Sequence, residues 1–320
     1  MTQIERQFLI ETLCEDLVPM IMEEYNLTDR EALDKLYKSN TFAKIEDPQT
    51  GLYYQGAVYV FDFLKEEFSK LGIKPGMNII VHSSLKSFGK VDGGADSVID
   101  ALCELLTEDG TLVMPSFNHG EPYRNGEICD ILETPTSNGI IPETFRKRPD
   151  VIRSINPTHS FAVWGKNKER YTKDHQQSGC FGVDSPLYRL MKDNGYCLLL
   201  GVGYDTNTFH HCVETCEGAK CVPAFYEAYP MRIESGEIIT ATRFAWRDGE
   251  CPITDKATYG EFMKPIEKRT VIGNSDIILY KLSEAYPIIA ECLKIGTGDG
   301  KCCSNCDIGP RQCKWTIKKD

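Results

Sequence analysis

The stretch MNIIVHSSLKSFGKVDGGADSVIDALCELLTEDGTLVMPSF, residues 77–117, combines two kinds of hydrophobic pattern. Residues 77–85 and 110–117 are short apolar runs bounded by turn residues, which is typical of buried strands. Between them, apolar residues recur at three- and four-residue spacing and so share one helical face: Ala95, Val98, Ile99, Leu102 and Leu106. Strand, helix and strand in this order predict a parallel pair joined by a crossover.

Other segments of the chain extend this α/β pattern. Residues 57–71 predict a helix that precedes the first strand. The run GYCLLLGVG, residues 195–203, is almost wholly apolar, as expected of a strand that is covered on both faces. Asn207 or Thr208 can then cap a helix over residues 209–216. We therefore predict an α/β fold with a mixed, largely parallel sheet flanked by helices.

The first 56 residues predict a separate, small helical module. Thr28 and Glu31 have the spacing of a capping box, which predicts that a second helix begins there. We expect the main domain to span residues 57–295 and a cysteine-rich segment to follow over residues 296–320. A first helix is indicated by apolar residues at helical spacing: Phe8, Leu9, Leu13, Leu17 and Ile21.

The composition excludes several classes of function. A formal net charge of −11 disfavours nucleic acid as a partner, because phosphates require a basic face, and it slightly favours a cationic ligand. No run of about 18 apolar residues predicts a membrane span, and the N-terminal residues lack the basic start of a signal peptide. We therefore expect a cytoplasmic protein. In such a chain the 14 cysteines indicate reduced thiols or a metal site rather than disulfides.

One candidate binding loop is HSSLKSFG, residues 82–89, which follows the first strand. Open α/β sheets bind ligands where strands end and helices begin. Small hydroxyl residues and glycines at such a place expose backbone N–H groups that can hold pyrophosphate oxygens, and Lys86 can add positive charge. The alternative is a polar loop in which His82 only ends a strand.

Two sites carry candidate catalytic histidines. His159 follows the Asn156-Pro157 turn at the start of an apolar run, where it can be a catalytic base or a structural histidine. His211 and Glu214 lie three residues apart, on one face of the predicted helix. A carboxylate in that position can orient an imidazole and raise its basicity, which is the logic of a general-base pair. The alternative is an ordinary exposed helical turn.

Three segments, residues 81–117, 139–165 and 181–214, occur in an order and spacing that closely resemble the aminoglycoside 3-N-acetyltransferase family. The resemblance covers roughly residues 57–295. It implies the transfer of acetyl from acetyl-CoA to the 3-amino group of the deoxystreptamine ring of an aminoglycoside, a polycationic amine. It also implies direct attack assisted by a general base, with no acetyl-enzyme intermediate.

The resemblance assigns roles to matched positions. Asn156 replaces the first histidine of the family's His-Pro-Thr-His-Ser segment, and Val183 replaces the acid of its Phe-Gly-Glu-x-Ser-Pro segment, with Asp184 beside it. No metal is implied at the catalytic site. The implied catalytic residues are His159, His211, Glu214 and Asp184. The implied coenzyme A contacts are His82, Ser83, Ser84, Lys86, Ser87 and Phe88.

The C-terminal segment departs from the family pattern. It provides four thiols, which are enough ligands for tetrahedral zinc, although their spacing is not that of a zinc ribbon with two pairs. Free thiols are the alternative to a zinc site. The four residues are Cys302, Cys303, Cys306 and Cys313.

Three other functions stay open on sequence grounds. The chain can be an acyl-CoA-dependent N-acyltransferase of another amine, because a family resemblance defines the acyl donor better than the acceptor. Cys212, beside His211, can be the nucleophile of an acyl carrier or hydrolase. The missing acid at position 183 and the additional N-terminal module are compatible with a catalytically inactive binding module. The sequence does not indicate an oligomeric state.

Overall fold

The computed structural model divides into two units, residues 1–63 and 64–320, which are described separately. Helix α4, Ala57–Leu71, begins in the first unit and ends in the second. The domain boundaries expected from the sequence therefore stay predictions. The residues that the structure describes are 3–39, 42, 57–89, 91–217, 226–244, 253–254, 257–273 and 275–295.

The first unit contains the helices α1, Gln3–Tyr25, and α2, Asp29–Tyr37. The Glu31 carboxylate accepts hydrogen bonds from the backbone N–H and the hydroxyl of Thr28, at 2.9 and 2.7 Å, so the predicted capping box is confirmed. The two helices bury a small apolar cluster whose members are Ile10, Cys14, Val18, Ala32 and Leu36.

The second unit is built on a seven-stranded sheet with the strand order β4-β5-β2-β1-β6-β10-β9. The neighbours β2, β1 and β6 are parallel, whereas β4–β5, β5–β2, β6–β10 and β10–β9 are antiparallel pairs. Only β5 and β10 run against the other strands, so the predicted mixed sheet is confirmed and its parallel pairs are confined to the centre. The bounds are β1 Asn78–Ser83, β2 Thr111–Phe117, β4 Ile152–Arg153, β5 His159–Gly165, β6 Tyr196–Leu200, β9 Lys268–Ile272 and β10 Ser275–Lys281.

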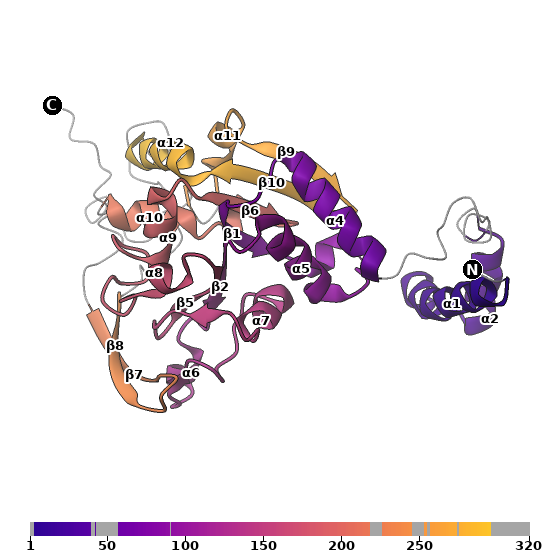
Figure 1. The fold of residues 1–320 in the computed structure, drawn as a ribbon, viewed down its shortest axis with the longest axis horizontal. Coiled ribbons are helices and arrows are strands. Elements are labelled where there is room, and N and C mark those ends of the chain that lie inside the picture. The colour runs from indigo at the N-terminus through magenta and orange to yellow at the C-terminus, as the bar shows by residue number, and fades with distance from the viewer. Residues whose placement is uncertain are drawn as a thin grey trace. The chain divides into compact units, whose positions relative to one another are not determined.

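Helices cover both faces of this sheet (Figure 1). On one side α5, Gly94–Leu106, packs on α7, Ile140–Arg146. On the other side α12 packs on α9 and α10, and α8 packs on α9. Their bounds are α8 Lys168–Thr172, α9 Pro186–Lys192, α10 Phe209–Cys216 and α12 Leu282–Ile295; shorter helical segments are η2 Leu85–Phe88, α6 Glu121–Arg124, η3 Tyr204–Thr206 and α11 Gly260–Met263.

The core lies on both faces of the three parallel strands. The apolar residues 79–81, 112–114 and 198–200 are fully buried, which is the burial expected of continuous apolar runs. Since these strands are rigid and central, the loops that follow them are held in fixed positions at one edge of the sheet.

A second, three-stranded sheet, with the order β3-β7-β8, was not predicted from the sequence. It joins β3, Cys129–Asp130, to β7, Tyr226–Arg232, and β8, Ile238–Phe244. The buried Arg153 guanidinium ties the loop after β3 to the main sheet, because it donates to the carbonyl oxygens of Thr134 and Ser116 at 2.6 and 2.8 Å. Burial lowers the pKa of Arg153 to about 10.

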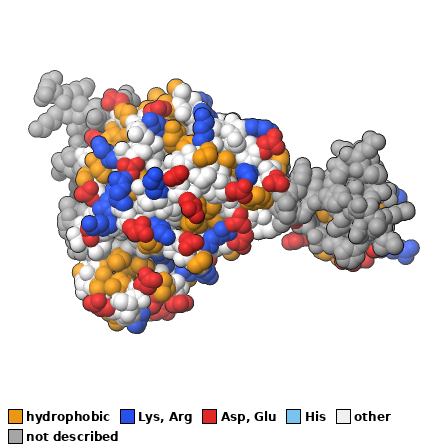
Figure 2. Space-filling view, viewed as in Figure 1, with side chains coloured by type: hydrophobic (Ala, Val, Ile, Leu, Met, Phe, Trp, Pro, Cys, Tyr) orange, Lys and Arg blue, Asp and Glu red, His pale blue; other side chains and the backbone are white. Residues whose placement is uncertain are grey.

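One face of the second unit is mixed in charge. Figure 2 shows Lys and Arg side chains interspersed with Asp and Glu side chains over the face that it draws. The net charge of −11 is therefore not gathered into one patch on that face. Within the described part of the chain, every helix is too short or too polar to cross a membrane.

Candidate active site

The candidate active site lies at the edge of the sheet where the three parallel strands end. Because β1, β2 and β6 are parallel neighbours, the loops that follow Ser83, Phe117 and Leu200 lie side by side. Strand β5 runs in the opposite direction and begins at His159, which pairs with Phe117. Three predicted features of the sequence, the Ser-rich loop, His159 and the segment that leads to His211, therefore meet at one edge.

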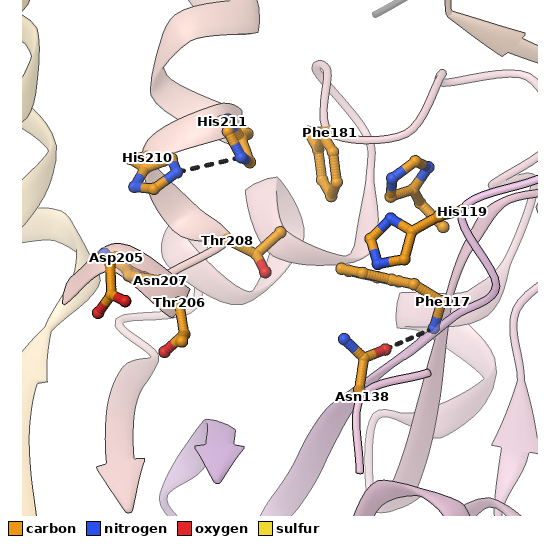
Figure 3. A pocket seen from close by; sticks show the side chains of 11 residues that line it. Phe117, His119, Asn138, Phe181, Asp205, Thr206, Asn207, Thr208, His210 and His211 are labelled. Carbon is orange, nitrogen blue, oxygen red and sulfur yellow. Dashed lines mark hydrogen bonds between the residues drawn. The ribbon is translucent and has the colours of Figure 1, made fainter. Parts of the chain in front are cut away.

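A cavity of about 460 Å³ opens at this edge. His210 and His211 lie on one side of it, Phe117 and His119 lie on the other, and Phe181 lies between them (Figure 3). Four of the six histidines of the chain line it. Among the described residues, those that line it are Phe117, His119, Asn138, His159, Phe181, Asp205, Thr206, Asn207, Thr208, His210 and His211.

His211 and Glu214 form the predicted pair on helix α10. The distance between His211 Nδ1 and Glu214 Oε2 is 2.8 Å, and the Glu214 side chain is fully buried. The second carboxylate oxygen, Oε1, accepts a hydrogen bond from the Thr254 hydroxyl at 3.0 Å. Helix α10 begins at Phe209, as the sequence predicts, and Asn207 Oδ1 accepts the backbone N–H of Phe209 at 3.2 Å. His211, in the first turn of this helix, lines the cavity.

His210 connects this pair to a buried tyrosine. Its Nε2 lies 3.1 Å from His211 Nε2, and its Nδ1 lies 3.1 Å from the Tyr259 hydroxyl oxygen. That oxygen accepts a hydrogen bond from Asn207 Nδ2 at 2.8 Å. Burial raises the pKa of Tyr259 well above its usual value, so the phenol stays neutral.

His159 is held by the turn that precedes it. Asn156 Oδ1 accepts the backbone N–H groups of Thr158 and His159 at 3.1 and 2.8 Å, which closes the predicted Asn-Pro turn. The ring nitrogen Nδ1 of His159 lies 2.8 Å from Thr158 Oγ1 and 3.5 Å from Cys180 Sγ. The turn and the Thr158 hydroxyl therefore fix the position of His159 at the cavity wall.

His119 is a cavity residue that the sequence analysis missed. It follows β2 with a φ of 51°, in the left-handed region that few non-glycine residues adopt, and its ring centroid lies 5.2 Å from that of His159. Burial and the nearby Arg124 lower the pKa of His119. Its position in the sequence could have identified it, because a histidine two residues beyond the end of a predicted strand lies at the edge of the sheet where ligands bind.

The predicted coenzyme A loop begins with two buried polar side chains. His82 Nε2 and Ser83 Oγ are buried without a hydrogen-bond partner among the described residues. Burial lowers the pKa of His82 to about 4, so its imidazole is neutral at ordinary pH. Such groups normally find a partner, which a bound ligand or water can supply. Neither residue lines the cavity beside His211, although the loop lies at the same edge.

The rest of the loop packs against the end of β6. Ser87 Oγ donates to the Ser84 carbonyl oxygen at 2.6 Å and accepts from Ser275 Oγ at 2.7 Å, and Phe88 is buried. Gly201 has a φ of +65°, and a Cβ atom there would lie 1.7 Å from Ser87 Oγ. Only glycine therefore permits this approach of the loop to β6.

The sequence resemblance implies that this loop contacts coenzyme A, and on that basis we expect Gly201→Ala to lower the affinity for acetyl-CoA. The added methyl group must displace Ser87, and the kcat/KM for acetyl-CoA should fall about 10-fold or more, as expected when a binding loop moves by about 1 Å. Steady-state kinetics measures the effect. Gly76→Ala is the matched control, because Gly76 has a similar φ of +79° but no atom within 4 Å of the added Cβ. Equal losses in both variants would contradict the steric argument.

The remaining predicted residues lie elsewhere. Asp184 is exposed in the turn before α9 and is not one of the described residues that line the cavity; its catalytic role stays a prediction. Cys212 is fully buried, and the hydrogen bond with Cys216 and the burial raise the pKa of its thiol well above the usual value. A protonated, inaccessible thiol is a poor nucleophile.

The predicted zinc site lies outside the described residues. Within the described ranges, no three His, Cys, Asp or Glu side chains are grouped so that they could hold a metal ion. The cysteines of the C-terminal segment, residues 296–320, are not among those residues, so the choice between zinc and free thiols stays open.

The fold and the site define a class of protein: an α/β protein with a ligand cavity at the carboxyl edge of its sheet and a carboxylate-bound histidine in the cavity wall. The family model for aminoglycoside 3-N-acetyltransferases matches residues 80–294, and the chain belongs to this family. This confirms the resemblance inferred from the sequence.

Known proteins of this family resemble the chain in sequence and fold. The aminoglycoside N(3')-acetyltransferase-like protein YokD of Bacillus subtilis is 40% identical over 171 residues, which are 47% of this chain and 63% of YokD. The crystal structure of YokD matches with a TM-score of 0.59 at 29% identity and covers 72% of this chain and 97% of that chain. Aminoglycoside N(3)-acetyltransferase IX of Micromonospora chalcea is 31% identical over 180 residues, which are 51% of this chain and 64% of that enzyme.

A third relative has been solved with an antibiotic. A histidine-to-alanine mutant of the aminoglycoside acetyltransferase AAC(3)-IVa, in complex with a gentamicin, matches with a TM-score of 0.64 at 26% identity and covers 78% of this chain and 96% of that chain. In the sequence alignments, this chain spans slightly less than two thirds of the length of the first two curated relatives.

Proposed function

We propose that the chain is an acetyltransferase that moves acetyl from acetyl-CoA to the 3-amino group of the deoxystreptamine ring of an aminoglycoside. The observation that carries the proposal is the His211–Glu214 pair, 2.8 Å apart, at a cavity on the same sheet edge as the Ser-rich loop. Membership of the aminoglycoside 3-N-acetyltransferase family supports the same activity.

The proposed reaction needs a base and a stabiliser of negative charge. An amine attacks a thioester only as the neutral base, so a protein group must take its proton before or during the attack. The Glu214 carboxylate orients His211 and stabilises its charged form, which makes His211 the better base of the two catalytic histidines. His159 has hydroxyl and thiol neighbours instead and is suited to contact the reacting carbonyl or the departing thiolate.

Acetyl-CoA is the proposed acyl donor. The unpartnered His82 Nε2 and Ser83 Oγ fit a ligand that brings hydrogen-bonding groups to the end of β1, and the half-buried Ser84 and the exposed Lys86 follow in the loop. In this proposal the loop binds the coenzyme, and His159 and His211 act on the thioester and the acceptor. We assign no step to a protein thiol, because Cys212 is buried and protonated.

The acceptor is the least constrained part of the proposal. The relative AAC(3)-IVa was solved with a gentamicin, an observation that favours an aminoglycoside. Asp205 is the carboxylate among the described lining residues, and the net charge of −11 also favours a cation. The second candidate is N-acylation of another amine, which the small number of carboxylates in the described lining favours.

The direct test is a turnover assay. Release of free CoA thiol from acetyl-CoA is measured with a panel of aminoglycosides, monoamines and arylamines, and the products are located by NMR. Acetylation at the 3-amino group supports the proposal. Turnover with only neutral or monocationic amines would support the second candidate, and absence of turnover with bound acetyl-CoA would indicate an inactive binding module.

We expect Asp205→Asn to raise the KM for an aminoglycoside about 2- to 5-fold, with a smaller change in kcat, because one charge pair at an exposed carboxylate is lost. The KM of the unchanged protein should also rise with salt, since the Debye length falls from about 10 Å at 0.1 M to about 3 Å at 1 M. Steady-state kinetics at several ionic strengths measures both effects.

Asp184→Asn is the matched control, because it removes one carboxylate that is not part of the described cavity lining. A larger effect of Asp184→Asn than of Asp205→Asn would support the role at the active site that the sequence resemblance implies for Asp184. A KM that is independent of salt for every amine would argue against a polycationic acceptor.

A further inference from the structure

His175 is a fully buried histidine that is not among the described residues that line the cavity. It lies in the stretch of turns, residues 173–185, that leads from α8 to α9. Its ring bonds to two different segments: Nδ1 lies 2.8 Å from Ser154 Oγ, next to strand β4, and Nε2 lies 3.0 Å from the Cys180 carbonyl oxygen. The ring therefore joins the stretch of turns to the edge of the main sheet.

The partners of His175 determine which ring nitrogen carries the hydrogen. The Cys180 carbonyl oxygen can only accept, so Nε2 carries the hydrogen and donates it. Ser154 Oγ accepts the backbone N–H of Phe161 at 2.8 Å, and its own hydrogen is then free to donate to Nδ1. Burial and the nearby Arg189 lower the pKa of His175 to about 4, so the ring keeps this neutral form at ordinary pH.

The carbonyl that His175 holds belongs to the peptide plane between Cys180 and Phe181. The side chains on both sides of this plane contact catalytic histidines. Cys180 Sγ lies 3.5 Å from His159 Nδ1. The ring centroid of Phe181 lies 5.2 Å from that of His159 and 5.7 Å from that of His211. The position of this one peptide plane therefore sets the surroundings of both imidazoles.

The stretch of turns needs a tie to the sheet because its own backbone bonds are local. The described backbone hydrogen bonds of residues 174–185 close turns between residues three apart, over 174–177 and 182–185. The His175 ring, in contrast, reaches the sheet through Ser154. Without its Nε2–H, the carbonyl oxygen of the buried Cys180 loses a donor, and the chain must shift to satisfy that oxygen elsewhere.

We propose that His175 is a positioning residue that holds Phe181 between the rings of His159 and His211. The inference rests on the proposed function, in which both histidines act on the thioester and the acceptor, and it is the same whichever of them takes the proton. An apolar ring packed against both imidazoles limits their rotation. Each catalytic nitrogen therefore keeps its direction towards the reacting atoms.

The first experiment needs no turnover and separates this inference from the proposed function. NMR of the ligand-free protein with ¹⁵N-labelled histidine should show one neutral ring with a hydrogen on Nε2 and none on Nδ1. That signal should be absent from His175→Phe and His175→Gln, which assigns it. In His175→Phe the ring signals of His159 and His211 should shift, because Phe181 has moved.

Two outcomes of the NMR experiment contradict the inference. A hydrogen on Nδ1 of His175 in the unchanged protein would mean that the ring does not donate to the Cys180 carbonyl oxygen. Signals of His159 and His211 that stay unchanged in folded His175→Phe would mean that the ring does not hold Phe181 against them. The first outcome is read from the unchanged protein, so it decides the matter even where the phenylalanine variant does not fold.

The second experiment measures turnover in the same variants. Phenylalanine fills the site of the imidazole but bonds to neither partner, and kcat should fall about 10- to 100-fold, the cost of a displacement of about 1 Å at the reacting centre. The KM for acetyl-CoA should change much less, because the proposed coenzyme loop follows β1. His175→Gln can present its oxygen to Ser154 and its NH₂ group to the Cys180 carbonyl oxygen, so it should recover much of kcat.

Tyr171→Phe is the matched control. The buried Tyr171 hydroxyl donates to Asp193 Oδ2 at 2.8 Å, so this variant loses one hydrogen bond of helix α8, directly before the stretch of turns. Thermal melts should show that both phenylalanine variants are destabilised, but only His175→Phe should lose kcat. Equal losses of kcat, or a folded His175→Gln as slow as His175→Phe, would show a purely structural role and overturn the inference. If the unchanged protein acetylates no amine, the proposed function fails and the NMR result alone decides the role of His175.

Discussion

Replacement of His159 by alanine is expected to lower kcat about 10²–10⁴-fold, the usual contribution of a group that transfers a proton or donates to the reacting centre. The ring lines the cavity, and its Nδ1 is bonded to Thr158 Oγ1 at 2.8 Å, so we expect Nε2 to contact the substrate. The Kd for acetyl-CoA should change little, because the residues proposed to bind the coenzyme lie in the loop after β1.

The pH profile of His159→Ala shows which role the residue has. If His211 is the base, the variant keeps the acidic limb of kcat at a lower plateau. If His159 is the base, a role that the sequence analysis left open for both histidines, the acidic limb disappears. Two acceptors whose amines have different pKa values must be compared, since deprotonation of the amine itself also produces an acidic limb. Normal turnover in the variant would remove His159 from the mechanism.

Local patterns predicted the parts of the fold that depend on neighbouring residues. The face of α5, the apolar runs of β1, β2 and β6 and the capping box of Thr28 and Glu31 were all predicted, because each signal spans only a few residues. The His211–Glu214 pair was predicted for the same reason, since residues three apart on a helix share a face.

The features that were not predicted from the sequence depend on contacts between segments that are distant along the chain. Strand β3 pairs with β7, about 100 residues later in the chain, and β7 contains Pro230, which weakens a strand pattern. His210 meets a tyrosine 49 residues away. Asn138 reaches the cavity because its side-chain oxygen accepts the backbone N–H of Phe117 at 2.7 Å, a contact without a local signature.

The predicted catalytic residues do not all lie at the cavity, and the reason is again whether a local pattern or only the resemblance predicted them. His159 and His211 meet at one cavity because β5 and α10 both begin at the carboxyl edge of the parallel strands. Asp184 was predicted from its position in a matched segment, but it lies in an exposed turn and is not part of the described lining. Its assignment to catalysis therefore has support from the sequence resemblance alone.

His211→Ala is expected to lower kcat at least as much as His159→Ala, about 10²–10⁴-fold, and to abolish the acidic limb that belongs to the base. Glu214→Gln should lower kcat less, because the imidazole remains. It loses the negative charge that stabilises protonated His211, and its amide can present either an oxygen or an NH₂ group to His211 Nδ1. When the NH₂ group faces Nδ1, His211 is held in the tautomer that cannot accept a proton on Nε2.

A double-mutant cycle tests whether the two residues act as a unit. Glu214 is fully buried, and of the two catalytic histidines it contacts His211, so its contribution to kcat should pass through that ring. In the background of His211→Ala, the change Glu214→Gln should therefore cost almost nothing further, because residues that act together are strongly non-additive. Circular dichroism and thermal melts of all three variants show whether each is folded. If the two losses multiply in folded proteins, Glu214 acts independently of the His211 ring, and the His211–Glu214 pair would not be the base.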